Sequence, residues 1–300
     1  MSMSKKLTGF FYGYLALLIL ICTTILGSLP VLLLGLIKLV PNQHLKIACG
    51  KMVDKIATAW VEINKFYLNK SNPAHIEISG LDNFSTDDWY LVVANHQSGL
   101  DIVILQILFS RKIPVLKFFI KDQLKWIPFL GFSWWAMGCP FMKRYTPAYL
   151  AKHPHKKGKD LQATQKALQL FQTTPASLMS FIEGTRFTPQ KKQEQNSPYK
   201  HLLKPRAGGI SFVVSAMNNR IHQLIDVTIT YSKQKSTLWD YLCHRVDVIK
   251  INIRKIPIPQ QFLTATLLED DKNQSEFRNW LNQKWLEKDQ LIDTMKKSPI

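Results

Sequence analysis

The feature that most restricts the fold is a long apolar run near the N-terminus, which extends from Leu7 to Val40 and contains one charged residue, Lys38. A membrane-spanning helix needs about 20 consecutive apolar residues, so this run is long enough. Gly27 and Pro30 interrupt it, and a proline within a helix removes a hydrogen-bond donor. We therefore expect one span or deep anchor over about residues 10–29, followed by a bend and a second apolar segment.

Other interpretations of this run stay open. A cleavable signal peptide competes, but the run is long and lacks a convincing small-x-small cleavage site followed by polar sequence. Its length also disfavours a buried helix of a soluble domain. Lysines lie on both sides of the run, so a single span has no clear orientation. A helical hairpin that dips into one leaflet would place both basic ends on the cytoplasmic side.

A second helical pattern extends from His44 to Leu68. Its apolar residues recur at helical spacing and leave a largely basic polar face. They are Ile47, Val53, Ile56, Trp60, Ile63 and Tyr67. Such a helix can lie on a membrane surface or cover a sheet. We predict that residues 1–70 form an anchor and an amphipathic helix, and that residues 71–300 form one further domain.

The remaining sequence alternates strand and helix patterns, which predicts an α/β fold with a mixed central sheet flanked by helices. A strand and a turn are expected at about 75–84, and further strands are expected at about 91–94, 112–120, 177–182, 224–231 and 246–253. Helices are expected at about 44–68, 99–109, 157–172 and 208–217, with a charged helix around residues 277–286. The apolar stretch 124–142 contains two prolines and two glycines, so we expect a membrane-facing segment within the domain rather than a second span.

Charge and cysteine usage limit the partners. The 300 residues include 39 Lys and Arg against 21 Asp and Glu, which gives a net charge of +18. This excess indicates an anionic partner, which could be nucleic acid, acidic lipid or a phosphorylated substrate. The 4 cysteines are widely spaced and form no C-x-x-C pair, which argues against a zinc site and a disulfide framework.

The stretch "LVVANHQSGLD" places His96 and Asp101 directly after a short buried strand. A histidine can act as a general base, and a carboxylate can fix its tautomer and stabilise its cation. On one continuous helix, residues five apart point about 140° away from each other. The pair is therefore useful only if a strand-to-helix turn folds His96 back towards Asp101. Asn95 and Ser98 could support that turn. A simple capped helix with a solvated aspartate is the alternative.

A second group of residues could bind an anion. A predicted strand ends at the sequence Glu183-Gly184-Thr185-Arg186, where glycine permits close approach of backbone N–H groups and arginine offers paired donors to a phosphate. Arg144 of "GCPFMKR" could add a second guanidinium, and two further cations are Lys117 and Lys121. No G-x-S-x-G, Walker A or G-x-G-x-x-G motif occurs, which leaves His96 as the base.

Together these stretches resemble the first three sequence blocks of the glycerophospholipid acyltransferases, the family of the 1-acylglycerol-3-phosphate acyltransferases. The first block, Asn-His-x-x-x-x-Asp, fits Asn95, His96 and Asp101. The second, Gly-x-x-Phe-x-x-Arg, fits Gly138, Phe141 and Arg144, and the third fits residues 183–186. The blocks occur in the family's order, and the resemblance covers about residues 76–231. It implies a glycerol-3-phosphate acyltransferase-like fold, with the catalytic domain and a C-terminal extension in residues 71–300.

One departure concerns the fourth block, which usually carries a proline within a short apolar strand, whereas "LIDVTITY" has Asp226 there. In this respect, and in "EGTRFTPQKK" and "LKPRAGG", the chain resembles the branch that contains lysocardiolipin and related lysophospholipid acyltransferases. The expected acceptor is lysophosphatidic acid, and another lysophospholipid is the alternative.

The resemblance implies a mechanism in which His96 takes the proton of a lysophospholipid hydroxyl and Asp101 orients His96. The oxygen then attacks an acyl thioester without a covalent acyl-enzyme. The implied residues that hold the acceptor or order its loop are Arg144, Glu183, Gly184, Thr185 and Arg186, with Lys121 nearby. No metal or cofactor is expected, since acyl-CoA or acyl carrier protein serves as co-substrate. The expected location is an anionic membrane, the inner membrane in a bacterium, with the catalytic domain facing the cytoplasm.

Three other classes of function are alternatives to acyl transfer. A nucleic-acid binder would be basic, but it would not need the apolar run, and we expect no nucleic-acid partner. A metal hydrolase could use His96 and Asp101 with His153 and His155, although the latter two lie in a lysine-rich segment. A catalytically inactive membrane scaffold is opposed by the presence of both His96 and Asp101.

Overall fold

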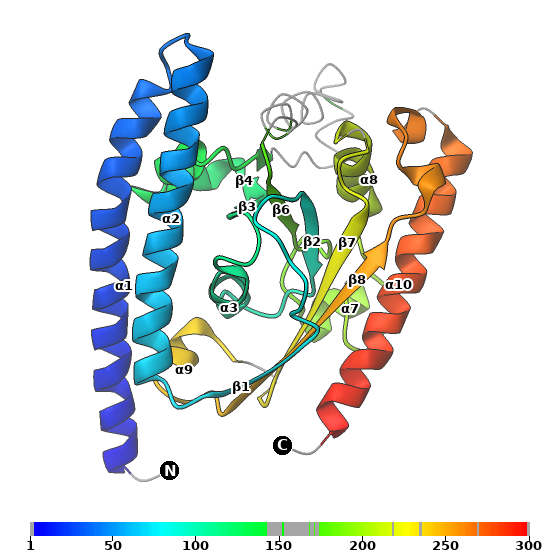
Figure 1. The fold of residues 1–300 in the computed structure, drawn as a ribbon. Coiled ribbons are helices and arrows are strands. Elements are labelled where there is room, and N and C mark those ends of the chain that lie inside the picture. Colours follow the sequence, from blue (N-terminus) through cyan, green and yellow to red (C-terminus); the bar gives the residue numbers. More distant parts are fainter. Residues whose placement is uncertain are drawn as a thin grey trace.

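The computed structural model of the chain describes residues 3–142, 152, 168, 171, 174–217, 219–233, 236–268 and 270–298. A six-stranded sheet forms its centre, with helices on both faces and two long N-terminal helices along one side (Figure 1). The strands are β1 (His75–Ser79), β2 (Tyr90–Ala94), β3 (Leu116–Phe118), β6 (Ser177–Ser180), β7 (Gln223–Tyr231) and β8 (Val248–Pro257). Their order is β1-β8-β7-β2-β6-β3, with β7 and β8 antiparallel and the other neighbours parallel. The predicted mixed α/β sheet is confirmed.

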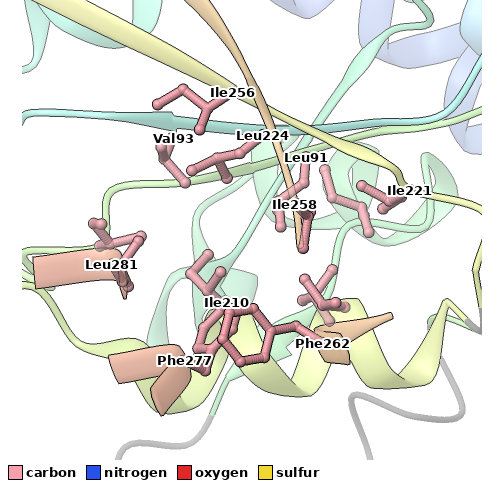
Figure 2. Packing of buried hydrophobic residues seen from close by; sticks show 14 of the residues in the cluster. Leu91, Val93, Ile210, Ile221, Leu224, Ile256, Ile258, Phe262, Phe277 and Leu281 are labelled. Atoms are coloured by element: carbon pink, nitrogen blue, oxygen red, sulfur yellow. The ribbon is translucent and has the colours of Figure 1, made fainter. Parts of the chain in front are cut away.

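Strand β2 lies in the middle of the sheet, and all five of its residues are buried. Successive side chains of a strand point to opposite faces, so β2 contributes to two separate cores. Leu91 and Val93 face α8 (Ala207–Ala216) and α10 (Asp271–Lys297), and Figure 2 shows them in one cluster with Ile210 of α8 and Leu281 of α10. The alternate residues of β2 pack with α3 (Leu100–Phe109) and α9 (Leu238–Leu242). Helices on both faces explain why β2 reads as a continuous apolar run.

The N-terminal apolar run forms one helix, α1 (Met3–Ile37), with Pro30 inside it. The expected break and second segment are therefore wrong. Beyond Pro30 the helix packs on α4 (Leu130–Ala136), and a Cβ on Gly35 would come within 2.9 Å of Phe132, so glycine permits this close contact. Lys38 also donates to the carbonyl of Ala136 at 2.7 Å. These contacts outweigh the one backbone hydrogen bond that Pro30 removes. In the described part of the chain, Leu7–Ile37 is the one helix long and apolar enough to cross a membrane.

Helix α2 (Gln43–Ser71) confirms the second helical pattern and lies antiparallel to α1 (Figure 1). Asn42 caps it by accepting from Leu45 N at 3.2 Å. Its buried face differs from the predicted one and consists of Cys49, Val53, Ala57, Val61, Asn64 and Leu68. Small residues on this face let the neighbouring helices approach. The larger Ile56 and Trp60 instead line a cavity, and Ile63 is 55% exposed. The predicted domain boundary at residue 70 stays a prediction.

The segment after α3 is less regular than expected. The predicted strand over 112–120 is split into β3 and a two-residue strand, β4 (Ile120–Lys121), which pairs with β5 (Phe141–Met142). A 3-10 helix, η1 (Asp122–Trp126), and α4 lie between β4 and β5 in the sequence. Trp126 is 80% exposed and Trp135 is 41% exposed. The predicted role of this segment at a membrane surface stays a prediction.

Some predicted features lie outside the described residues, namely Arg144, His153, His155 and almost all of the helix over 157–172. Other short elements were not predicted, including α7 (Pro189–Glu194), α9 and the 3-10 helices η3 (Gln260–Phe262) and η4 (Ala265–Leu268). The charged C-terminal helix is α10, and it buries Phe277, Leu281 and Trp285.

Candidate functional site

Three adjacent parallel strands deliver polar side chains at one edge of the sheet. His96 lies two residues after β2, Glu183 lies three residues after β6, and β7 ends at Tyr231. Strand β2 pairs in parallel with both β6 and β7, so their carboxyl ends meet at the same edge. Ligand sites of open α/β sheets lie outside such carboxyl ends.

Asn95 fixes the start of the turn between β2 and α3. Its buried side-chain amide donates to the carbonyl of Ile229 and accepts from the N–H of Ile229, both at 2.9 Å. The amide therefore continues the backbone pairing of β2 with β7 past the last strand residue. Ser98 Oγ accepts from Leu100 N at 3.1 Å in the first turn of α3. The support that the sequence predicted for this turn is present.

The turn brings His96 and Asp101 together. His96 Nδ1 lies 2.8 Å from Asp101 Oδ2. The same oxygen accepts from Gln97 N at 2.7 Å and Ser98 N at 2.9 Å. A carboxylate can only accept hydrogen bonds, so the proton between the two side chains belongs to Nδ1. In the neutral ring the other nitrogen, Nε2, then carries the free lone pair. In this arrangement the histidine has a nitrogen that can accept a proton.

Tyr231 completes the surroundings of Asp101 and was not predicted from the sequence. Its hydroxyl donates to Asp101 Oδ1 at 2.5 Å. Burial and the neighbouring Asp101 carboxylate raise the pKa of Tyr231 well above 10, so this phenol stays a donor. Asp101 is 0% exposed, and its four donors compensate for the burial of its charge. Tyr231 closes the strand predicted over 224–231, but the sequence did not indicate that this strand pairs with β2.

Phe181 fixes the plane of the imidazole. Its ring stacks on His96 with the centroids 3.9 Å apart and an angle of 15° between the planes. The side chain of His96 is 13% exposed and lines a cavity. With Nδ1 on Asp101 and one face on Phe181, Nε2 is the part of the ring that remains to meet a substrate.

Glu183 lies beneath the loop rather than on its open surface. Its side chain is 0% exposed, and its two oxygens accept from His96 N at 2.7 Å and Leu203 N at 2.8 Å. Burial raises the pKa of Glu183 to about 7. The prediction that Glu183 orders its loop agrees with these contacts, whereas direct contact of its carboxyl with a substrate does not.

Replacement of Glu183 by Gln should make the stability less dependent on pH. Glu183 holds its proton up to a pKa of about 7 in the folded chain against 4.5 as its ordinary value, so the folded state binds more protons between these limits. The stability of the wild type relative to Glu183→Gln should therefore fall as the pH rises from 4.5 to 7, by roughly 3 kcal/mol. Urea unfolding in detergent at both pH values measures this difference.

The control for this experiment is Glu194→Gln, a change in an exposed residue of α7 that should alter the free energy of unfolding by less than about 0.5 kcal/mol at either pH. A wild type that gains stability relative to Glu183→Gln as the pH rises would contradict the expected sign.

Helix α10 holds the segment that carries Leu203. Trp285 Nε1 donates to the carbonyl of Leu203 at 3.0 Å. The carboxylate of Asp289 accepts from Lys200 N and His201 N, each at 2.7 Å. The C-terminal helix thus positions Leu203 N under Glu183, and through Glu183 it supports the backbone of His96. This link joins residues far apart in sequence and was not predicted.

The rest of the loop borders the cavity. Gly184 has φ +74°, a conformation that favours glycine, and a Cβ there would lie 2.8 Å from Arg206 Nε. Gly184, Thr185 and Arg186 all line the cavity. Their predicted role in phosphate binding stays a prediction. An exposed Arg186 guanidinium beside this loop can bind an anion through paired donors.

The cavity has a volume of about 790 Å³. One part is lined by His96 and the loop at 184–186, and other parts are lined by α1, α2, α3 and α4. Most of the lining side chains are apolar, and among the residues from α1 and α2 are Leu20, Gly27, Val31, Ile56 and Trp60. An apolar chain could therefore lie in the cavity while its polar end reaches His96.

The two candidate lysines differ in position. Lys121 is exposed and lines the cavity. Lys117 is 3% exposed and forms an ion pair with Asp54 of α2. Its suggested role as a free cation at the site is wrong, because strand β3 points it towards α2, where it joins the helical pair to the sheet.

Asp226, the departure in the fourth block, is a buried ionic residue of β7. Its carboxylate lies 2.7 Å from Lys288 Nζ of α10 and 2.7 Å from a terminal nitrogen of Arg254 on β8. Lys288 is fully buried and also donates to the carbonyl of Val227 at 2.7 Å. Asp226 therefore ties α10 to the sheet on the face away from α3. Within the described residues, no group of three or more His, Cys, Asp and Glu side chains could hold a metal ion.

Comparisons with known proteins identify the family of this chain. A model of the Acyltransferase family matches residues 75–232, just over half of the chain. The 1-acyl-sn-glycerol-3-phosphate acyltransferase epsilon of Mus musculus is 24% identical over 70% of this chain and 58% of its own length. An uncharacterized acyltransferase of Schizosaccharomyces pombe is 24% identical over 68% of this chain and 59% of its own length. The chain thus spans less than two thirds of these relatives.

Among solved structures, the 1-acyl-sn-glycerophosphate (LPA) acyltransferase PlsC of Thermotoga maritima has a TM-score of 0.56 and 15% identity, with 98% of both chains covered. At this identity the likeness concerns the fold, and it includes the N-terminal helices as well as the sheet. The sequence match covers β1 to β7, the strands whose ends carry His96, Glu183 and Tyr231. This chain belongs to the acyltransferase family.

Proposed function

We propose that the protein transfers a fatty acyl group from an acyl thioester to the free hydroxyl of a lysophospholipid, with lysophosphatidic acid as the first choice of acceptor and phosphatidic acid as product. The observation that carries this proposal is an oriented histidine base at a largely apolar cavity of about 790 Å³, next to a loop with an exposed arginine. A lysophospholipid has the matching parts, namely a hydroxyl, an apolar chain and a phosphate.

In the proposed reaction, His96 Nε2 takes the proton of the acceptor hydroxyl as its oxygen attacks the thioester carbonyl carbon. The imidazolium is stabilised by Asp101, which lies 2.8 Å from Nδ1. The tetrahedral intermediate then collapses, the C–S bond breaks, and the leaving thiolate receives the proton from His96. One ester and one thiol are formed, and the histidine returns to its initial state.

The acceptor phosphate is assigned to the loop at 184–186, with Arg144 as a further ligand from the sequence pattern. Arginine binds phosphate oxygens through two parallel N–H donors, and Gly184 leaves the backbone of the loop accessible. Glu183 acts from below by holding the His96 and Leu203 backbones. This arrangement fixes the hydroxyl of a bound acceptor relative to His96.

The apolar part of the cavity is assigned to an acyl chain, which gives a prediction about chain length. Gly27→Leu would place a side chain into the part lined by α1 and α2, where a Cβ added at Gly27 would lie 3.4 Å from Trp60. This variant should prefer acyl chains shorter than those of the wild type by two or more carbons. The control is Leu26→Phe, since Leu26 is 67% exposed on α1. An unchanged chain-length profile in Gly27→Leu would contradict the assignment.

Membrane association is supported by the outward surface of α1, where Leu18, Leu26 and Leu33 are 58%, 67% and 65% exposed. We propose that α1 and α2 attach the protein to anionic phospholipid, with the catalytic domain on the cytoplasmic side. Flotation with vesicles that contain phosphatidylglycerol tests this attachment. Protein that remains in the lower, lipid-free fractions at low salt would contradict it.

The test of the proposed function uses detergent-solubilised protein and labelled acyl-CoA or acyl carrier protein, with lysophosphatidic acid and lysophosphatidylglycerol as competing acceptors. We expect a labelled phospholipid, and the preferred product identifies the acceptor. Lysophosphatidylglycerol as the better acceptor would support the alternative in which another lysophospholipid is acylated. Correctly folded protein that transfers no label from either donor would support the inactive scaffold.

A further inference from the structure

We propose that Lys191 is a further ligand of the acceptor phosphate, beside Arg186, and this inference rests on the proposed function. Lys191 belongs to α7, the short helix that follows the loop at 183–186. Its Nζ lies 2.7 Å from Thr185 Oγ1 and 3.2 Å from the carbonyl of Arg186. The side chain therefore folds back over the loop instead of extending into solvent.

The ammonium group of Lys191 has a free donor at the site. An ammonium carries three N–H donors, and Thr185 and Arg186 accept two of them. Lys191 lines the cavity together with His96, Gly184, Thr185 and Arg186. None of the ion pairs among the described residues includes Lys191, so its charge lines the cavity without a carboxylate partner among these residues.

Thr185 can also donate to a ligand, because its hydroxyl oxygen accepts from Lys191 and its own hydrogen remains available. A hydroxyl that accepts from an ammonium can still donate its own hydrogen. Lys191, Thr185 and Arg186 consequently offer donors from one wall of the cavity, and two of them carry positive charge. A phosphomonoester carries between one and two negative charges at neutral pH and has several acceptor oxygens, which suits this group of donors.

Both substrates carry phosphate, so the source of the bound phosphate must be assigned. Thr185 lies on the same loop as Gly184, whose φ of +74° shapes the turn beside the backbone of His96, and Lys191 folds back onto this loop from α7. In a lysophosphatidic acid the phosphate and the free hydroxyl are joined by a short glycerol, so both must lie near His96. The phosphates of coenzyme A are separated from the thioester by the long pantetheine arm. The geometry therefore assigns the acceptor phosphate to Lys191.

The next residue supplies a matched control. Lys192 has the same charge and lies on the same helix, but its Nζ donates to the carbonyl of Lys200 at 3.2 Å and it does not line the cavity. Lys191→Met and Lys192→Met therefore remove the same charge from adjacent positions. A conservative variant, Lys191→Arg, restores a cation with donors.

Steady-state acyl transfer in mixed micelles tests the inference on the full chain, with the wild type and these three variants. Lys191→Met should raise the KM for lysophosphatidic acid by about tenfold or more, the usual effect of losing one charged hydrogen bond. The kcat and the KM for acyl-CoA should stay within about threefold, Lys191→Arg should recover most of the loss, and Lys192→Met should resemble the wild type. Far-ultraviolet circular dichroism and the Tm show whether each variant is folded.

Two results would overturn the inference. An acceptor KM for Lys191→Met equal to that of Lys192→Met would remove Lys191 from the site, and a rise confined to the KM for acyl-CoA would assign it to the donor. Both results require an active wild type. A wild type that acylates no lysophospholipid would instead contradict the proposed function itself, so the two failures are distinguishable.

Discussion

Replacement of His96 by Ala is expected to lower kcat for acyl transfer by about a thousandfold or more, within the range usual for loss of a general base. The KM values should change little, because the phosphate and the acyl chain are assigned to other residues. The imidazole is held by Asp101 at 2.8 Å and by the stacked ring of Phe181 at 3.9 Å. No other histidine side chain lines the cavity among the described residues. The measurement is the initial rate of labelled phospholipid formation at saturating substrates.

The matched control for His96→Ala is His75→Ala. His75 lies on β1 at the far edge of the sheet, and its side chain is 65% exposed. Its loss should leave kcat within about twofold, since surface substitutions away from special features have small effects. A rate for His96→Ala above a tenth of the wild-type rate would show that another group removes the proton.

Asp101→Asn is expected to lower kcat by about a hundredfold or more while leaving the chain folded. An asparagine oxygen can accept from the same three donors, His96 Nδ1, Gln97 N and Ser98 N, so the turn is retained. What is lost is the negative charge that stabilises the imidazolium formed as the hydroxyl is deprotonated. Comparison of kcat for the wild type and the variant, with KM for both substrates, measures this effect.

Tyr231→Phe tests the same part of the site from the opposite side of Asp101. It removes the donor at 2.5 Å from Oδ1 but keeps the carboxylate and its other three donors. The loss of kcat should therefore be smaller than in Asp101→Asn, at about tenfold, the effect of one hydrogen bond to a charged group. If Asp101→Asn kept kcat within tenfold of the wild type, the Asp101 charge would have no large part in the reaction.

The parts of the site that depend on short stretches of sequence were predictable. His96 and Asp101 are five residues apart, and a single turn decides whether they meet, so the choice was between two local geometries. The strand before His96 was predicted because it is apolar throughout, and the structure shows that helices cover both of its faces. The α/β class followed from the alternation of strands and helices.

The contacts that depend on pairing of distant segments were not predictable in this way. Tyr231 reaches Asp101, which is 130 residues away in the sequence, because β7 lies parallel to β2. Glu183 is supported by Leu203, which in turn is held by Trp285 of α10. Periodicity shows which residues form an apolar face, but it does not show which helix packs over which strand.

Two local rules were overridden by packing. Pro30 was expected to end a helix, but α1 continues through it to pack on α4. In α2 the apolar stripe predicted from spacing includes Ile56 and Trp60, which line the cavity, and Ile56 also packs against a small core cluster. A cavity that binds an apolar chain is lined by apolar side chains, just as a core is. The sequence pattern alone therefore could not distinguish cavity-lining residues from core residues.

In the proposed reaction the acceptor hydroxyl attacks the thioester directly with the help of His96. The sharpest test of this step incubates the wild type with labelled acyl-CoA. Labelled phospholipid, released coenzyme A and protein-bound label are then measured in the same samples. With lysophosphatidic acid present, one phosphatidic acid should form for each coenzyme A released. Without the acceptor, neither product nor label on the protein should accumulate. Coenzyme A released in a burst with label retained on the protein would contradict direct attack by the acceptor hydroxyl, and failure to form phosphatidic acid would contradict the proposed acceptor.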